Sequence, residues 1–329
     1  MLEMCFRFAH EVYVLTPGRV NIDNQINSPG VFSALSSSGN LRLFIFYLVL
    51  TLAVLAFALW LKSTRPFQRI GRFINRASGF APDIIRVAFG ASLIFSAANN
   101  ALFGPELPID SFPLPDLLRT GLLVAGVGLT LGIFTGYFAW AAVLLFVFGL
   151  LDKGTYMLTY VNYLGEAIAI ILLPRQRFSV DRLIRKIKTA KSKAKTLRLE
   201  KYSMPVARIL FGLSLLYTAI DVKFLGSALS LNVVQRYNLT DYFPYDPLFI
   251  VLGAGLIESL IALLYIFGVL QRFNTVFFLI FLVLSLTFFN ESVWPHYLLI
   301  ALAVGIFLHK PDIWAADRYL FPEKLKSKK

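Results

Sequence analysis

Glu258 stands inside a long apolar run, where an ionisable side chain is costly. It follows Pro247 by 11 residues, or roughly 16 Å at 1.5 Å per helical residue, which is near the middle of a hydrocarbon core of ~30 Å. The side chains one turn away, at Ala254, Gly255 and Ala262, are small, so this face is expected to contact another helix. The sequence therefore predicts for Glu258 either a proton-carrying or ligand-binding carboxyl group, or a neutral carboxyl group that is hydrogen-bonded within the fold.

A second acid, Glu166, belongs to a polar stripe within another apolar run. Thr159, Asn162 and Tyr163 precede it at helical spacing, so the four side chains share one helix face. Such a stripe indicates either a ligand-binding surface that runs inward from the membrane surface or a set of hydrogen bonds between helices.

Five further polar residues fall at the ends of apolar runs on one side of the second half: Asp221, Lys223, Asn290, Glu291 and His296. Histidine titrates near neutral pH, and a neighbouring carboxylate would orient it as a general base or as a hydrogen-bond partner of a quinone. The alternative is a solvated rim without chemistry.

Arg86 and Arg208 occupy the same place, one turn into their apolar runs. Their guanidinium groups are expected either to reach lipid phosphates or to bind substrate. The candidate catalytic residues are Glu258, His296 and Asp221, and the candidate ligand-binding residues are Glu166, Asn162, Lys223, Glu291 and Arg208.

Metal and thiol chemistry have few residues to draw on. The only cysteine is Cys5, which excludes an intrachain disulfide and a CxxC redox pair. Three histidines are too few for a pair of bis-His haems or a zinc site, and no Gly-rich phosphate loop or nucleophile elbow is present. We therefore predict no metal or haem, and any redox role requires a cofactor from elsewhere.

The elements that position these residues are membrane-spanning helices. The chain is 57% hydrophobic and 16% charged, with a mean hydropathy of +0.68, whereas a soluble domain carries roughly 25% charged residues. Nine runs approach the ~20 residues that cross a bilayer. They are 41–61, 83–103, 116–134, 137–151, 157–174, 205–225, 247–270, 273–289 and 294–310.

Basic residues predict the orientation of these spans. Of the 32 Lys and Arg residues, 23 fall at the start of the span 273–289 and in the segments 62–82, 175–204 and 310–329, which lie on one side if the N-terminus is outside. By the positive-inside rule that side is cytoplasmic. The segment before the first span lacks a charged n-region directly ahead of a short apolar stretch, so we expect an uncleaved anchor in a multi-pass protein of the cell membrane.

Two of the basic segments have helical amphipathic spacing, at 66–80 and at 181–199. Each is expected to lie on the inner membrane surface and to bind anionic lipid headgroups. We predict no nucleic-acid partner from the net charge of +13, because the charge is divided among these segments.

The two halves of the chain resemble one another. Residues 85–102 match 207–224 at an offset of 122, with Arg86 on Arg208 and Gly90 on Gly212, and later Asn162-Tyr163-Leu164 matches His296-Tyr297-Leu298, which places Glu166 on Ile300. An even number of spans per half makes the halves parallel repeats. The predicted fold is an all-α integral membrane protein with one anchor and two four-helix bundles. The expected divisions are a tail (1–40), the anchor (41–61), a linker (62–82), the first unit (83–174), a second linker (175–204), the second unit (205–310) and a basic tail (311–329).

The second unit carries the motifs of a known family. Arg208 opens a Gly/Phe/Ser-rich span that runs on to Lys223, the next span contains Gly255 and Glu258, and the last opens with Trp-Pro-His at 294–296. This pattern resembles the DoxX/DoxD-like family of four-helix membrane proteins, whose first span reads R..LG...L..G..K. The first unit shares the resemblance more faintly, and there the lysine is replaced by Ala101.

The resemblance implies a role beside a quinone or a thiol-redox partner, because the family takes its name from a membrane component of a thiosulfate:quinone oxidoreductase. We therefore expect a membrane subunit that binds a quinone or similar lipophilic redox molecule and serves an extracytoplasmic redox protein. The alternatives are a small-solute transporter or channel, and a non-catalytic scaffold or lipid-binding assembly factor.

Overall fold

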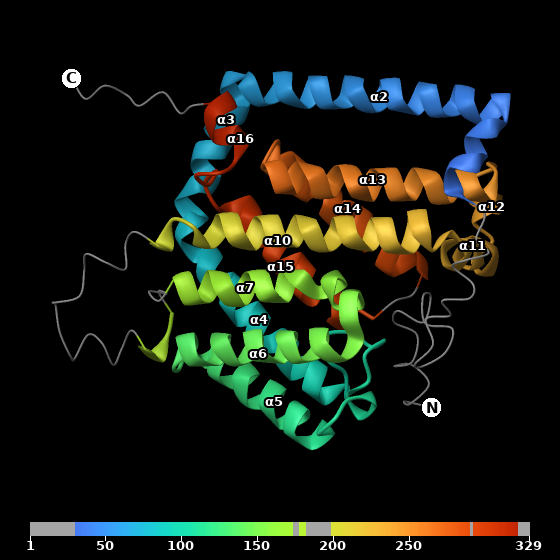
Figure 1. The fold of residues 1–329 in the computed structure, drawn as a ribbon. Helices are drawn as coiled ribbons and strands as arrows, with labels where there is room; N and C mark the ends of the chain where they lie inside the picture. The colour runs from blue at the N-terminus through green and yellow to red at the C-terminus, as the bar shows by residue number, and fades with distance from the viewer. Residues whose placement is uncertain (1–29, 174–177, 182–198, 290–291, 322–329) are drawn as a thin grey trace, which may run out of the picture.

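The computed structural model describes residues 30–173, 178–181, 199–289 and 292–321, and within these ranges the chain forms helices and no strand (Figure 1). Asn290, Glu291, most of the N-terminal tail and most of the second basic linker lie outside the described residues. The α-helices are α2 (Ser38–Ser63), α3 (Arg65–Ile74), α4 (Ala81–Ala98), α5 (Pro115–Leu131), α6 (Thr135–Lys153), α7 (Val161–Leu172), α10 (Ser203–Thr218), α11 (Ser227–Arg236), α12 (Leu239–Tyr242), α13 (Pro247–Phe267), α14 (Gln271–Phe289), α15 (Tyr297–Leu308) and α16 (Ala316–Leu320).

Six helical segments of the described chain are long and apolar enough to cross a membrane. They are Ser38–Ser63, Arg65–Ala98, Thr135–Leu172, Ser203–Leu225, Pro247–Phe267 and Gln271–Phe289. The protein is therefore a multi-pass membrane protein by helix length and composition.

Three of the nine expected spans do not reach this length as separate helices. α5 has 17 residues, and α7 and α15 have 12 each, because a 3-10 helix precedes each of the last two. The segment Thr135–Leu172 is also not one straight rod, since α6 and α7 pack side by side as a hairpin.

The first helix of each half packs tightly on the next long helix of the same half. A Cβ atom at Gly90 of α4 would lie 2.6 Å from the carbonyl oxygen of Gly126 on α5, and a Cβ atom at Gly212 of α10 would lie 2.8 Å from that of Ala262 on α13. Real Cβ atoms do not approach oxygen so closely. Glycine at these two matching positions therefore allows the helix backbones to come into direct contact.

The last helix of each half packs against the first helix of the other half. α7 lies against α10, where a Cβ atom at Gly165 would lie 2.6 Å from Leu210. α15 lies against α4, where a Cβ atom at Gly305 would lie 2.7 Å from Ile85. One apolar core accordingly contains α15 side chains together with the first half, and the other contains α4 and α7 side chains together with the second. The two halves therefore share core residues, while the four long helices of each half also contact one another in a closed ring.

Two turns, between α5 and α6 and between α13 and α14, have the same construction at the end of the molecule that carries α3, here called the α3 end (Figure 1). Each begins with a glycine at positive φ, +72° at Gly132 and +66° at Gly268. Asp181 accepts hydrogen bonds from two successive backbone N–H groups of the first turn, both at 2.9 Å, and Asp317 accepts two from the second, at 2.8 and 3.0 Å. The carboxylates satisfy N–H groups that a helix start leaves without partners.

These matching turns change part of the alignment between the halves. The turn glycines and aspartates correspond at an offset of 136, while Arg86 and Arg208 correspond at 122, because the second half inserts α11 and α12 after its first helix. α7 and α15, which have equal length, also follow the offset of 136. Glu166 therefore aligns with Leu302, not with Ile300.

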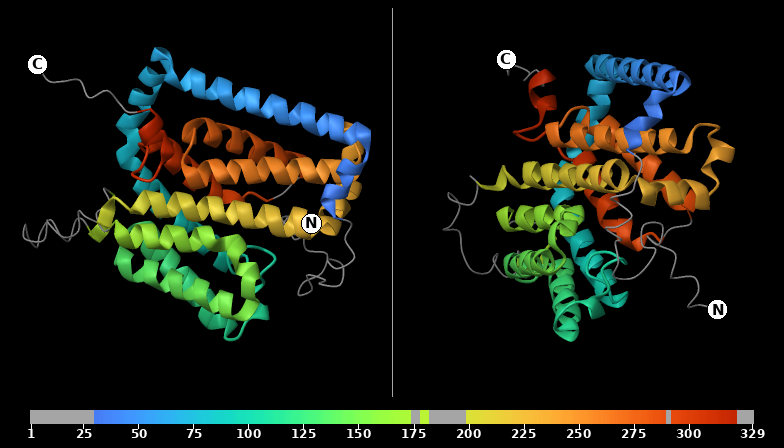
Figure 2. Two further views of the ribbon diagram at one scale, coloured as in Figure 1. Left: turned by 45° about the horizontal axis from the view of Figure 1, so that its top comes forward. Right: turned by 45° about the vertical axis from the view of Figure 1, so that its right-hand side comes forward.

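α2 stands at the edge of the bundle, and both views of Figure 2 place it on the outside. Ala58 is its only buried residue. Its ends carry the polar contacts: Tyr47 shares a hydrogen bond with Tyr245, and Lys62 forms an ion pair with Asp317. A helix that is apolar on all sides and so little buried fits an anchor surrounded by lipid.

Candidate functional site

Glu258 and Lys223 form an ion pair. Lys223 Nζ donates a hydrogen bond to Glu258 Oε2 at 2.6 Å, and the two side chains are 23% and 8% exposed, the glutamate being the more open. Lys223 belongs to a π-helical segment, Ala219–Leu225, that continues α10, and Glu258 lies near the middle of α13. Removed from water, each of these charges depends on the other.

A glycine allows this ion pair to form. A Cβ atom at Gly255 would lie 2.5 Å from the ring of Phe224 and 3.2 Å from Lys223 Cβ, so only glycine lets the π-helical segment approach α13 here. π-Helical turns are frequent at functional sites. Asp221, on the same segment, lies within electrostatic range of Tyr156 in the first half. Asp221 therefore sits close to the contact between the halves.

Glu166 is fully buried on α7, and within the described part of the chain neither of its carboxylate oxygens has a hydrogen-bond partner. The Nδ2 group of Asn162, one turn earlier and 2% exposed, and the hydroxyl of buried Ser96 on α4 make no hydrogen bond of good geometry among these residues, while Asn162 lies within interaction range of Glu166 and Ser96 within that of Tyr163. An ionised carboxylate in this position would be strongly unfavourable, so Glu166 is expected to hold its proton. The result is a set of buried O–H and N–H donors without acceptors.

The polar groups that surround Glu166 and Asn162 come from both halves of the chain. The Tyr163 hydroxyl shares a hydrogen bond of 2.7 Å with Ser92 Oγ on α4. Ser214 on α10 donates to the carbonyl oxygen of Thr159 and lies 3.2 Å from Asn162 Oδ1. The polar stripe predicted from the sequence is therefore placed where α7 packs against the first helix of the second half.

Glu106, in the connection between α4 and α5, is a neighbour of this site that the sequence does not single out. Its carboxylate accepts hydrogen bonds from the hydroxyls of Tyr160 and Tyr156, the latter at 3.3 Å. A Cβ atom at Gly104 would collide with the Tyr160 hydroxyl, so glycine makes room for the contact. Burial raises the pKa of Glu106 from 4.5 to about 7, against the opposing effect of its hydrogen bonds.

Rings continue from Glu106 toward the buried acid. The Tyr160 and Tyr163 ring centroids are 6.0 Å apart in an edge-on arrangement, and Tyr163 lies within electrostatic range of Glu166. Tyrosine side chains thus lie between Glu106, in the connection that follows α4, and the buried carboxyl group of Glu166.

His296 lies apart from this set. It belongs to a 3-10 turn, Trp294–His296, that packs against α4, it is 7% exposed, and its Nδ1 atom lies 3.2 Å from the carbonyl oxygen of Ser292. Glu291, which the sequence places beside it, is outside the described residues.

Arg208 and Arg86 are buried ties between helix ends, each 1% exposed. Arg208 donates to two carbonyl oxygens in the last turn of α13 and forms an ion pair with Asp312 at 2.7 Å. Arg86 donates to two carbonyl oxygens in the last turn of α5 and to the carbonyl oxygen of Phe178. These contacts occupy the guanidinium groups within the fold, so neither is turned toward lipid phosphates.

No family model, no curated protein and no solved structure matches the chain. The resemblance to the DoxX/DoxD-like family therefore stays a prediction from the sequence.

The chemistry of the site follows from its unsatisfied groups. Among the described residues no three His, Cys, Asp or Glu side chains gather into a metal-binding group. The buried donors around Glu166 lack acceptors, which is costly unless something supplies them. A carbonyl or ether oxygen of a bound molecule would be such an acceptor, and a protonated carboxyl could also transfer its proton to it.

Proposed function

We propose that the chain crosses the membrane nine times, as an anchor and two parallel, symmetry-related units, with the α3 end in the cytoplasm. Gly90 and Gly212 make equivalent helix contacts in their own halves, and Asp181 and Asp317 accept equivalent hydrogen bonds; both observations support the relation between the units. The gathering of basic residues in the segments at the α3 end supports the orientation.

We propose further that the protein is a membrane subunit that binds a quinone or a similar lipophilic redox molecule beside Glu166, for an extracytoplasmic redox partner. The observation that carries this is the set of fully buried donors without acceptors at Glu166 and Asn162. A quinone offers two carbonyl oxygens that accept such hydrogen bonds, and it reaches a site between helices from the lipid.

In this proposal the residues of the chain bind the molecule and manage protons. Asn162 would hold a carbonyl oxygen of the molecule with its amide, and Glu166 would donate a hydrogen bond and supply a proton at the same place. The tyrosines and Glu106 would return a proton to Glu166 from the opposite membrane face to α3, since the pKa of Glu106, near 7, suits exchange with water. A bound quinone would accept two electrons from the partner protein together with two protons.

Two substitutions of Glu166 test this function differently. Glu166→Leu places in the first half the residue found at the matching position of the second, and it should weaken binding of decylubiquinone by at least tenfold, about 1.4 kcal/mol. Glu166→Gln keeps N–H donors, so it should bind nearly normally but lose proton uptake on quinone reduction. Glu258→Gln is the control carboxylate. If the purified parent protein binds no quinone, or if only Glu258→Gln reduces binding, the proposed site is wrong.

A proton-coupled transporter of a small solute is the second candidate, favoured by one observation. Glu166 lies where α7 of the first half packs against α10 of the second, and transporters built from repeats bind their substrates at the repeat interface. In proteoliposomes a transporter would accumulate solute under a pH gradient, and Glu166→Gln would abolish this accumulation. A quinone-binding subunit would show no uptake.

A further inference from the structure

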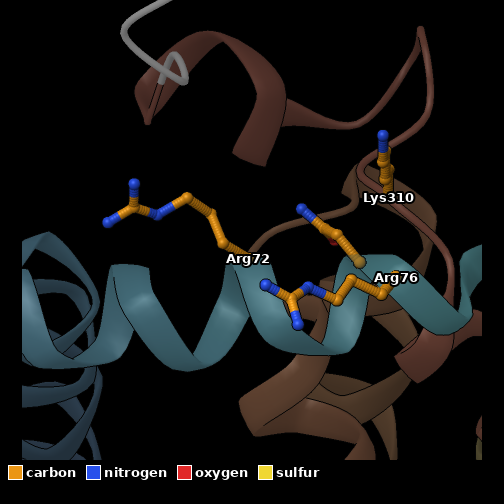
Figure 3. A pocket seen from close by; sticks show the side chains of 4 residues that line it. Arg72, Arg76 and Lys310 are labelled. Atoms are coloured by element: carbon orange, nitrogen blue, oxygen red, sulfur yellow. The ribbon is translucent and has the colours of Figure 1, made fainter. Parts of the chain in front are cut away.

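A shallow cavity of about 270 Å³, wide open to the surroundings, lies at the α3 end and is lined by Asn75 and the exposed side chains of Arg72, Arg76 and Lys310. Figure 3 shows Arg72 and Arg76 on α3 and the turn that follows it, with Lys310 on the segment after α15. The volume is near the lower end of the roughly 300–1,000 Å³ of small-molecule sites, so the cavity suits a headgroup rather than a whole lipid.

Arg272 fixes the walls of this cavity. Its Nη1 atom donates to the carbonyl oxygen of Gly71 at 3.1 Å, its Nε atom to that of Phe307 at 3.0 Å, and its Nη2 atom to Asn75 Oδ1. A Cβ atom at Gly71 would lie 2.9 Å from the guanidinium, so glycine permits this approach. One side chain thus ties α3 to the end of α15 and orders the cavity before a ligand arrives.

The positive charge of the cavity is not neutralised within the described residues, where none of its three cationic side chains forms an ion pair. Two acids on the neighbouring segment are already engaged. Asp312 pairs with Arg208, and Asp317 pairs with Lys62 and accepts two backbone N–H groups. Three cations around one opening match an anion with several acceptor oxygens.

The position of the cavity relative to the membrane follows from α3. This helix lies across the ends of the long helices (Figure 1) and exposes Phe67, Ile70 and Phe73 by 42, 53 and 69%. An amphipathic helix with such side chains lies in the membrane interface, which brings the cavity to the level of the headgroups. We propose that this cavity binds the phosphate group of an anionic phospholipid headgroup. A soluble phosphate compound offers the same chemistry and is the competing source.

The test compares two double variants of equal charge on one helix. Native mass spectrometry of the full chain in detergent would measure binding of phosphatidic acid against phosphatidylcholine. Arg72→Gln with Arg76→Gln should weaken phosphatidic acid binding at least tenfold, about 1.4 kcal/mol, and Lys310→Gln should weaken it roughly threefold. Arg65→Gln with Arg69→Gln, which removes the same charge outside the cavity, should change it by less than about twofold.

Three outcomes would overturn the proposal. Equal losses in the two double variants would mean that lipid is attracted by diffuse surface charge. Normal binding by Lys310→Gln, an exposed residue on a different segment from α3, would exclude the cavity as the site. Displacement of phosphatidic acid by millimolar inorganic phosphate would assign the cavity to a soluble phosphate compound, whereas failure of phosphate to compete supports the lipid.

Discussion

The ion pair between Lys223 and Glu258 provides a quantitative prediction. Removing one partner of a buried pair costs about 3–5 kcal/mol, because the remaining charge is left in a poorly solvating medium. Glu258 is 23% exposed, so water screens the pair and we expect a cost below this range, about 2–3 kcal/mol, for either single substitution. Glu258→Gln should cost more than Lys223→Met, because the cation it leaves behind is only 8% exposed.

The double variant decides whether the two side chains act together. Replacing both removes the charge that each single substitution leaves without its ion-pair partner, so the double variant should be more stable than the sum of the single effects predicts, by at least about 1 kcal/mol. Thermal or denaturant unfolding in detergent, followed by tryptophan fluorescence, measures each corner of the cycle. Additive effects would refute the argument and would mean that the 2.6 Å contact contributes nothing to the fold.

Three further predictions concern pH, packing and topology. Folding favours the protonated form of Glu106, so its contribution to stability is highest below pH 4.5 and falls by at most about 3 kcal/mol as the pH rises to about 7. Glu106→Gln should remove this fall from unfolding curves measured as a function of pH. The same pH profile in the parent and the variant would contradict the raised pKa of Glu106. Gly90→Ala should lower the free energy of unfolding by about 3 kcal/mol or more, because the added methyl group meets backbone atoms of α5. Gly136→Ala should have little effect, because the space around Gly136 is open. Equal effects of the two substitutions on the melting temperature would exclude close packing of α4 on α5. In a background without the native cysteine, an impermeant thiol reagent applied outside intact cells should label a cysteine at Asp241 and not one at Arg69, both exposed positions, and the reverse labelling would invert the topology.

The sequence predicts those features that depend on local pattern. Apolar runs of span length predict the helices. The pair Arg86 and Gly90 matches the pair Arg208 and Gly212 in sequence, because each arginine binds the end of the neighbouring long helix and each glycine allows that helix to approach. The paired Asp-Arg sequences at 181–182 and 317–318 follow similar aromatic and small residues, so the matching turns could also have been found.

Other features depend on contacts between segments that are distant in the sequence, and the spacing of apolar residues does not predict such contacts. α7 and α15 have the pattern of any apolar helix, and nothing local says that each packs on the other half. Glu106 looks like a solvated loop acid, and only the position of Tyr160 across from Gly104 reveals its burial. The insertion of α11 and α12 lengthens the offset between the halves from 122 to 136, and the matched Tyr-Leu pairs at 163–164 and 297–298 place the last helices two residues short of this value.

The central claim is that Glu166 is a protonated carboxyl group that meets a bound quinone. Infrared difference spectroscopy of the purified protein, with and without decylubiquinone, tests it directly through the carbonyl stretching band of a protonated carboxyl group. We predict a band in the parent protein that shifts when the quinone binds, persists in Glu258→Gln and is lost in Glu166→Gln. The spectra are recorded well above pH 7, where Glu106 is ionised and gives no such band. Under these conditions, a band that does not respond to the quinone, or one that survives in Glu166→Gln, would contradict the account.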